Sequence, residues 1–231
     1  MLHSHAGPGE KTRATVWTVI VAGGSGLRFG ERKQFIDLAG KSVLERSVET
    51  ALEHSHGVVI VVPDDSIGDT VANFVDPKIS VVGGGSTRAK SVRFGLGAIE
   101  ARVSPDDVVL IHDAARPLAS NELYQRLIAA VSESTPAVVP VIEIADTLRE
   151  VGGGTVDRSK LRAVQTPQAF RAQTILEAHS TGEEGTDDAS LVELMSGVAV
   201  MMVEGEAPNR KITTRFDFDA ARAHLAAHAR Q

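Results

Sequence analysis

The sequence predicts an α/β fold with three layers around a mostly parallel sheet, extended by a β-arm. Short apolar runs of the length typical of fully buried strands alternate along the chain with longer segments of helical periodicity. Glycine-rich turns follow two of these runs. Since parallel α/β sheets bind ligands at the carboxyl ends of their strands, we expect these turns to be binding loops.

Composition limits the classes of protein and partner. The chain has 231 residues, of which 42% are hydrophobic, enough to bury a sizeable core. It has no cysteine, which excludes thiolate zinc sites and thiol catalysis and agrees with a cytoplasmic protein. A formal charge of −6 argues against nucleic acid as a partner, and no apolar stretch approaches the ~18 residues of a membrane span. Any anionic ligand must therefore meet a local cluster of cations.

Residues 1–14 are interpreted as a flexible leader, because this stretch contains His, Gly and Lys and lacks the apolar core of a signal peptide. Residues 15–231 are then expected to form a single domain.

The first buried run, Val19-Ile20-Val21-Ala22, breaks into a loop that contains Gly23, Gly24 and Gly26 and then Arg28 and Lys33. Glycines let the backbone N–H groups face a phosphate, and the two cations supply charge for a polyphosphate. We therefore predict a phosphate-binding loop. A glycine-rich turn with solvated cations is the alternative.

Two better-known phosphate loops do not fit this segment. The dinucleotide fingerprint G-x-G-x-x-G fails at Phe29, and the Walker pattern that would end at Gly40-Lys41-Ser42 fails at Phe35. The failed fingerprint counts against a nicotinamide-dependent oxidoreductase.

The next elements keep alternating: a helix over 41–53, a strand over 58–62, a weak helix over 66–74 and a strand over 78–82. Residues 83–92 then form a second glycine-rich loop, a candidate phosphate or base site. Ser86 or Thr87 can cap the helix that runs to about Ala101, and its first-turn N–H groups attract an anion. Alternatively, the glycines only form the turn.

The strand over 108–111 delivers His112-Asp113-Ala114-Ala115-Arg116-Pro117 at its carboxyl end. Asp113 can orient a metal or a hydroxyl, and Arg116 can clamp a second phosphate. His112 is expected to be a satisfied core histidine rather than a catalytic base.

A helix over 121–132 leads to a strand over 137–141, where Pro140 predicts an edge position or an irregular ladder. Residues 142–164 read as a polar hairpin that extends from the main sheet. A lone hairpin is marginal in water, so we expect this arm to pack against another subunit in a homodimer.

The C-terminal third is expected to continue with a helix through His179, an acidic loop over 181–188, a helix to Met195 capped by Asp187 or Asp188, a strand over 198–203 and a helix over 217–229. His224 and His228 are four apart and could in principle share a metal, but an exposed helix end is the preferred interpretation.

Five separated segments together resemble one family, the 2-C-methyl-D-erythritol 4-phosphate cytidylyltransferases, with the ribitol 5-phosphate cytidylyltransferases as close relatives. The resemblance covers about residues 16 to 228 and rests on Ala22-Gly23-Gly24-Ser25-Gly26-Leu27-Arg28 with Lys33-Gln34, Gly84-Gly85-Ser86-Thr87-Arg88-Ala89-Lys90-Ser91-Val92, His112 to Pro117, Gln165-Thr166-Pro167-Gln168-Ala169-Phe170, and Asn209-Arg210-Lys211-Ile212-Thr213. Arg32 stands where the family usually has a proline before the loop lysine, and the spacing from Arg28 to Lys33 is shorter than usual.

The resemblance implies a three-layer, Rossmann-like nucleotidyltransferase fold and a role for each matching residue. Arg28, Lys33 and Lys211 would be the catalytic cations, and Ala22, Gly23 and Gly24 part of the CTP triphosphate cradle. Gly84, Gly85 and Ser91 would hold the cytosine and Ala114 the ribose. The residues implied around the polyol phosphate and the α-phosphate are Asp113, Arg116, Thr147, Thr166 and Thr186, with Arg158 reaching the partner subunit's acceptor.

The activity implied is transfer of CMP from CTP to 2-C-methyl-D-erythritol 4-phosphate, with release of pyrophosphate, for isoprenoid precursor synthesis. Mg²⁺ is expected to enter mainly through the CTP phosphates rather than through a protein metal site. Ribitol 5-phosphate is the alternative acceptor. A nicotinamide-dependent oxidoreductase and a non-catalytic nucleotide sensor are the alternatives from other classes.

Overall fold

The computed structural model describes residues 14–23 and 32–228. The predicted leader, apart from Ala14, lies outside the described residues, as do Gly24 and Arg28 of the first loop.

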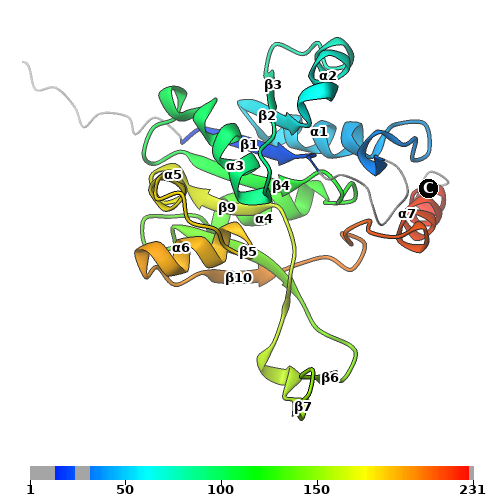
Figure 1. Cartoon of the computed structure of the whole chain (residues 1–231), viewed down its shortest axis with the longest axis vertical. Coiled ribbons are helices and arrows are strands. Elements are labelled where there is room, and N and C mark those ends of the chain that lie inside the picture. The colour runs from blue at the N-terminus through cyan, green and yellow to red at the C-terminus, as the bar shows by residue number, and fades with distance from the viewer. Residues whose placement is uncertain (1–13, 24–31, 229–231) are drawn as a thin grey trace, which may run out of the picture.

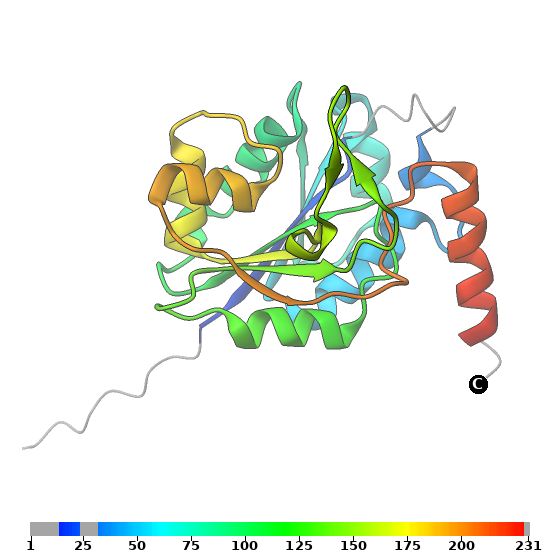
Figure 2. The same cartoon turned by 90° about the horizontal axis from the view of Figure 1, so that it is seen from below.

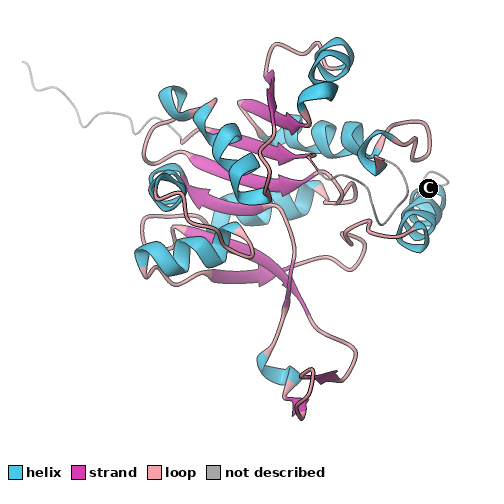
Figure 3. Ribbon diagram, in the orientation of Figure 1, coloured by secondary structure: helices cyan, strands magenta, loops and turns pink. Residues whose placement is uncertain are grey.

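An eight-stranded sheet forms the centre of the molecule, in the order β10-β5-β9-β4-β1-β2-β3 with β8 paired to β5 (Figures 1 and 3). Only β9 and β8 pair antiparallel with their neighbours. The strands are β1 (Val16–Val21), β2 (Gly57–Val62), β3 (Ile79–Gly83), β4 (Val108–Asp113), β5 (Ala137–Ile142), β8 (Ala163–Val164), β9 (Gln168–Arg171) and β10 (Met201–Glu204).

Helices cover both faces of the sheet, which confirms the predicted three layers (Figure 2). One face packs on α3 (Arg88–Gly97), α5 (Ala172–Ser180) and α6 (Asp188–Ser196), and the other on α1 (Val43–His54) and α4 (Asn121–Ala130). Successive residues of a strand point to opposite faces, so Val19 joins one core cluster and Ile20 the other. This is why the central strands read as continuous apolar runs.

The remaining helices lie at the margins of the molecule. The weak helix predicted over 66–74 is a 3₁₀ turn, η2 (Asp64–Ser66), followed by α2 (Ile67–Asn73). The last helix, α7 (Arg215–His228), packs Phe218 and Ala221 on Leu38 and Val43 rather than on the sheet. No helix within 14–23 and 32–228 is both long enough and apolar enough to cross a membrane.

Pro140 does not lie on an edge strand, since β5 has β10 on one side and both β9 and β8 on the other. The expectation of an irregular ladder is confirmed, however. Partner β9 pairs with Ala137 and Val138, β8 pairs with Val141 and Ile142, and Pro140 lies at the change of partner. Its carbonyl accepts a hydrogen bond from the Gln165 N–H at 2.8 Å. The missing N–H of proline is tolerated where the ladder is already interrupted.

The predicted arm over 142–164 projects from the body of the molecule (Figure 1). Its outer part is a separate antiparallel pair, β6 (Leu148–Arg149) with β7 (Thr155–Val156), followed by the 3₁₀ turn η4 (Arg158–Lys160). Val151 at its tip is fully exposed. The arm returns to the main sheet through β8, so only its base is anchored within the chain.

Candidate functional site

A cleft of about 350 Å³ lies at the carboxyl ends of β1, β3 and β4. Three of the five motifs meet there directly, and Lys211 reaches it from a fourth. The predicted site residues that line the cleft are Ala22, Gly23, Lys33, Gly85, Ser91, Asp113, Ala114 and Lys211. Residues almost 190 positions apart in sequence therefore share one surface.

Lys33 and Gln34 hold the described part of the first loop against the rest of the site. The buried Gln34 amide donates to the Ala22 carbonyl at 2.8 Å. The ammonium of Lys33, in the 3₁₀ turn η1 (Lys33–Phe35), donates to the Ile212 carbonyl at 2.6 Å. This contact places Lys33 beside the segment that carries Lys211.

The second loop has the predicted helix cap. Thr87, rather than Ser86, accepts a hydrogen bond from the Lys90 N–H at 3.1 Å and starts α3. The Ser91 hydroxyl accepts from the Gly85 N–H at 3.0 Å and donates to the Thr87 carbonyl at 2.9 Å. A Cβ at Gly85 would lie 2.4 Å from Lys90, so this tight turn requires glycine.

Gly84 is not among the residues that line the cleft, although it adjoins them. Its N–H continues the strand by donating to the Val62 carbonyl at 2.7 Å. A Cβ at this position would lie 3.3 Å from the Ser91 hydroxyl.

Asp113 is the anionic centre of the cleft. Its Oδ1 accepts from the Arg88 Nε at 3.0 Å, and its Oδ2 from the Lys211 ammonium at 2.6 Å. Burial by itself would raise the pKa of Asp113, but the two cations outweigh burial and hold that pKa well below its usual range. Asp113 therefore stays ionised and fixes both cations.

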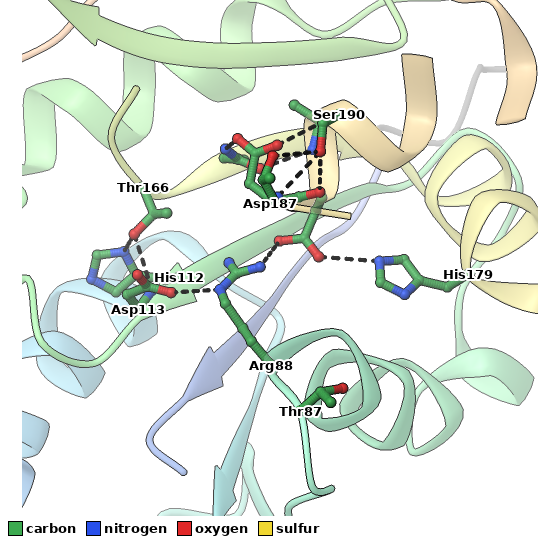
Figure 4. Close-up of polar contacts among 12 residues, drawn as sticks. Thr87, Arg88, His112, Asp113, Thr166, His179, Asp187 and Ser190 are labelled. Carbon is green, nitrogen blue, oxygen red and sulfur yellow. Dashed lines mark hydrogen bonds and ion pairs between the residues drawn. The ribbon is translucent and has the colours of Figure 1, made fainter. Parts of the chain in front are cut away.

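Sequence reasoning missed Arg88 as a site residue, although its motif had been singled out. Arg88 lies between two carboxylates, Asp113 and the buried Asp188, which accepts from its Nη1 at 2.8 Å (Figure 4). Burial would lower the pKa of Arg88, but the two carboxylates raise it above its ordinary value. The cationic side chain of Arg88 beside the glycines of the motif was the available signal, but its partner Asp188 lies a hundred residues away.

His112 is a satisfied core histidine, as expected. Its Nε2 lies 3.2 Å from the Arg116 carbonyl, which can only accept, so Nε2 carries the proton and Nδ1 accepts from the Thr166 hydroxyl at 3.2 Å. The same hydroxyl accepts from the Asp113 N–H at 3.0 Å. Complete burial lowers the pKa of His112 to about 4, which keeps the ring neutral.

Thr166 and Arg116 lie behind the cleft rather than on its lining. Thr166 is buried and is engaged with His112 and Asp113 (Figure 4). The Arg116 guanidinium donates to the Asn209 carbonyl at 2.9 Å and holds the Lys211 segment in place. Burial lowers the pKa of Arg116.

The other three predicted contacts lie apart from the cleft lining. Thr147 is exposed on the arm, and Thr186 is exposed with its hydroxyl 3.1 Å from that of Ser190. Arg158 donates to the carbonyls of Ile144 and Ala145, beside a separate hollow on the arm. Within one chain, the structure does not bring Arg158 to Asp113.

Arg32, at the position where the family usually has proline, pairs with residues of η2 instead of joining the cleft. Its two terminal nitrogens each lie 2.7 Å from a carboxylate oxygen of Asp65, and one donates to the Ser66 hydroxyl at 2.7 Å. The contacts of the Arg32 guanidinium with Asp65 and Ser66 fix the residue that precedes η1, while the side chain of Lys33 points into the cleft.

The described residues contain no group of three or more His, Asp or Glu side chains that could hold a metal ion. The rings of His224 and His228 lie with their centroids 4.1 Å apart, tilted by 36° to each other, near the end of α7. They gain no third ligand from the described residues. Asp113 is the single carboxylate among the described residues that line the cleft. A dedicated metal cage within these residues is therefore absent.

Comparison with known proteins gives one family. The family model described as "IspD: 2-C-methyl-D-erythritol 4-phosphate cytidylyltransferase" matches residues 16–227. A protein of this name from Saccharopolyspora erythraea is 40% identical over 227 residues, covering 92% of this chain and 100% of the relative. The crystal structure of 4-diphosphocytidyl-2C-methyl-D-erythritol synthase from Anaerococcus prevotii superposes with a TM-score of 0.77 at 30% identity, covering 92% of this chain and 96% of that one.

Some similar relatives are longer proteins. The bifunctional enzyme IspD/IspF of Nitrobacter hamburgensis is 42% identical over 227 residues, which cover 90% of this chain but 55% of the relative. The chain thus spans about half the length of these bifunctional relatives and nearly all of the single-function ones.

Proposed function

The chain belongs to the 2-C-methyl-D-erythritol 4-phosphate cytidylyltransferase family, and from this premise we propose that it transfers CMP from CTP to 2-C-methyl-D-erythritol 4-phosphate. The products are 4-diphosphocytidyl-2-C-methyl-D-erythritol and pyrophosphate. The whole protein's activity, substrates and partners are part of this proposal.

The observation that carries it is that Lys33, Arg88 and Lys211 line one glycine-rich cleft, where Asp113 pairs with Arg88 and Lys211 and Lys33 contacts the neighbouring Ile212 carbonyl. Three cations in one small cleft are unusual on a chain of net charge −6, and they suit a highly anionic ligand. The glycine turns supply backbone N–H groups beside them.

The chemistry requires positioning and charge neutralisation more than covalent help. An oxygen of the acceptor phosphate attacks the α-phosphorus of CTP, forming a new P–O bond while the bond to the β-phosphate oxygen breaks and pyrophosphate leaves. The attacking oxygen is already anionic near neutral pH, so no protein base is needed. We propose that Lys33, Lys211 and Arg28 neutralise the charge on the α-phosphate and the leaving group.

Mg²⁺ is part of the proposal as a companion of the nucleotide. The donor set of the described residues does not fit a protein-held ion, because both oxygens of Asp113 already contact cations. We therefore assign the ion to the CTP phosphates, where it would offset charge between the two anionic substrates.

A homodimer completes the proposed site. The arm is anchored only at its base, and Arg158 near its outer end lies apart from the chain's own cleft. We propose that Arg158 reaches the acceptor phosphate bound in the partner subunit, with Thr147 on the same arm and Thr186 contributing contacts to the acceptor. A cytoplasmic location goes with the proposal.

Membership in this family leaves the oxidoreductase alternative without support, and the relatives named above are enzymes rather than nucleotide sensors. The test is to mix the purified chain with CTP, Mg²⁺ and 2-C-methyl-D-erythritol 4-phosphate. We expect stoichiometric pyrophosphate and a CMP-containing diphosphate product. Absence of pyrophosphate with this and any other polyol phosphate would contradict the transferase proposal.

A further inference from the structure

Five alternately basic and acidic side chains, His179, Asp188, Arg88, Asp113 and Lys211, form a continuous series of contacts from the interior to the cleft. Figure 4 shows the part of this series that contains His179, Arg88 and Asp113. His179 Nε2 lies 3.1 Å from Asp188 Oδ1, and Asp188 Oδ2 lies 2.8 Å from Arg88 Nη1. Arg88 Nε lies 3.0 Å from Asp113 Oδ1, and Asp113 Oδ2 lies 2.6 Å from the Lys211 ammonium. Each carboxylate thus uses both of its oxygens, one toward each neighbour.

The two ends of this series differ in exposure. The side chains of His179 and Asp188 are 3% and 1% exposed, while those of Arg88, Asp113 and Lys211 are 30%, 10% and 41% exposed. One end is therefore fixed in the protein interior, and the other end faces the proposed substrates.

The inner end is itself held firmly. Asp188 is the first residue of α6, directly after the N-cap Asp187, whose side chain forms a capping box with Ser190. Gln168 on β9 donates to Asp187 at 2.7 Å and accepts from the Ala189 N–H at 3.1 Å. This arrangement fixes the start of α6 to the central sheet.

We propose that Asp188, supported by His179, is a positioning residue that fixes Arg88 and, through Arg88, sets Asp113 and Lys211 for the transfer step. This inference rests on the proposed cytidylyl transfer and deepens it.

The physical reason is the number of cations that Asp113 must hold. With Asp188 present, Arg88 has a second anion and uses only one oxygen of Asp113. Without the charge of Asp188, Arg88 can turn both arms of its fork onto Asp113 and compete with Lys211 for Oδ2. Lys211 would then lose its fixed position.

The central experiment compares Asp188→Asn with a matched control, Asp107→Asn. Asp107 is also a buried carboxylate, and it accepts hydrogen bonds from the Thr15 and Ser104 N–H groups at 2.7 and 2.8 Å. It lies just before the amino end of β4, whereas Asp113 lies at the carboxyl end of the same strand. We expect both variants to melt at lower temperature. Only Asp188→Asn should lower kcat, by ~10- to 100-fold, where kcat is expressed per CTP-binding site and the sites are counted by calorimetry. The KM for CTP should change less than ~3-fold.

A second experiment tests whether Asp188 acts through Lys211. In a Lys211→Ala background, Asp188→Asn should cost less than ~2-fold further in kcat, because the group it positions is already gone. If the kcat of the double variant instead falls by the product of the two single-variant losses, the inference is wrong. A kcat of Asp188→Asn within ~2-fold of wild type would also overturn it.

Should Asp188→Asn fail to fold, His179→Leu removes the support of Asp188 without removing its charge. We expect kcat to fall by ~3- to 10-fold and to recover in His179→Gln, whose amide can donate to Asp188. Equal kcat values for wild type, His179→Leu and His179→Gln would contradict the role.

A crystal structure of Asp188→Asn, or of His179→Leu, reports the geometry without turnover. We expect the contact between Lys211 and Asp113 to lengthen beyond hydrogen-bond distance. Its retention would overturn the inference even if the wild-type chain released no pyrophosphate, a result that would count separately against the proposed function.

Discussion

Asp113 holds Arg88 and Lys211 in the cleft, and Lys33 and Lys211 are the cations within the described residues that we assign to catalysis. We predict that Lys33→Ala and Lys211→Ala each lower kcat by at least ~10²-fold, about 3 kcal/mol, as for loss of one pre-placed charge. Neither ammonium is deeply buried, so the melting temperature should shift by less than about 4 °C.

The matched control for these two variants is Lys41→Ala, because Lys41 is an exposed lysine that pairs with Glu49 on α1 and does not line the cleft. Its kcat should equal that of wild type. If Lys33→Ala or Lys211→Ala keeps more than about half of the wild-type activity, its assigned role is wrong.

His112 predicts a pH dependence of stability. Burial lowers its pKa in the folded chain to about 4, below the value of about 6.5 in an unfolded chain. The unfolded state therefore binds the proton first, and stability falls as pH decreases from about 6.5 to 4, by up to about 3 kcal/mol. Urea unfolding across this range measures the loss.

The variant His112→Gln cannot take up this proton, so its stability should fall less over the same range. The contribution of the Asp113 carboxylate is separable, since its lowered pKa places the loss of its ion pairs below pH 4. Equal slopes for wild type and His112→Gln between pH 6.5 and 4 would show that His112 is not the titrating group.

The arm is the element that makes the strongest claim about assembly. If Arg158 acts in the partner's site, a chain with Arg158→Ala and a chain with Lys33→Ala should complement each other. A mixed dimer has one composite site with both residues intact, so random mixing should restore about a quarter of the wild-type rate. Turnover after co-refolding equal amounts of the two chains measures this.

Formation of mixed dimers must be shown independently, for example with two chains of different tag length separated by native chromatography. Mixed dimers that form without any gain in rate would rule out a shared site. A monomer in solution would contradict the arm's role in dimerisation.

Elements could be predicted where one local signal dominates. The buried strands around Ile20, Ile60 and Leu110 are continuous apolar runs, and their alternation with helices predicts a mostly parallel sheet between two helical layers. The order of the strands in the sheet is not contained in this alternation. The late strand is shorter than expected, 201–204 rather than 198–203, because its outer edge is unpaired and its residues are largely exposed. The position of Pro140 depends on two different partner strands, which a local pattern does not contain.

The site was predictable as a set of loops but not as a set of contacts. The carboxyl-end rule indicated Gly85 and Asp113 correctly as neighbours in one cleft. The pairing of Arg88 with Asp188, and of Lys33 with the Ile212 carbonyl, joins segments 100 and 179 residues apart. No local periodicity specifies such pairs, because they depend on how the helices pack.

At the scale of the whole molecule, the acceptor is the most consequential assignment. The two candidate polyol phosphates carry the same phosphate and differ in a methyl group and chain length, so the cations of the cleft serve either. Apolar contact with one methyl discriminates by only ~1 to 3 kcal/mol, or roughly 10- to 200-fold. Hydroxyl contacts would have to supply any larger preference.

The most direct test of the account is therefore kcat/KM for 2-C-methyl-D-erythritol 4-phosphate and for ribitol 5-phosphate, measured by pyrophosphate release with CTP and Mg²⁺ saturating. We predict a preference for the methylerythritol phosphate of at least ~10-fold. A preference for ribitol 5-phosphate would contradict the assigned acceptor while leaving the fold and cleft as described, and no release with either would contradict cytidylyl transfer itself.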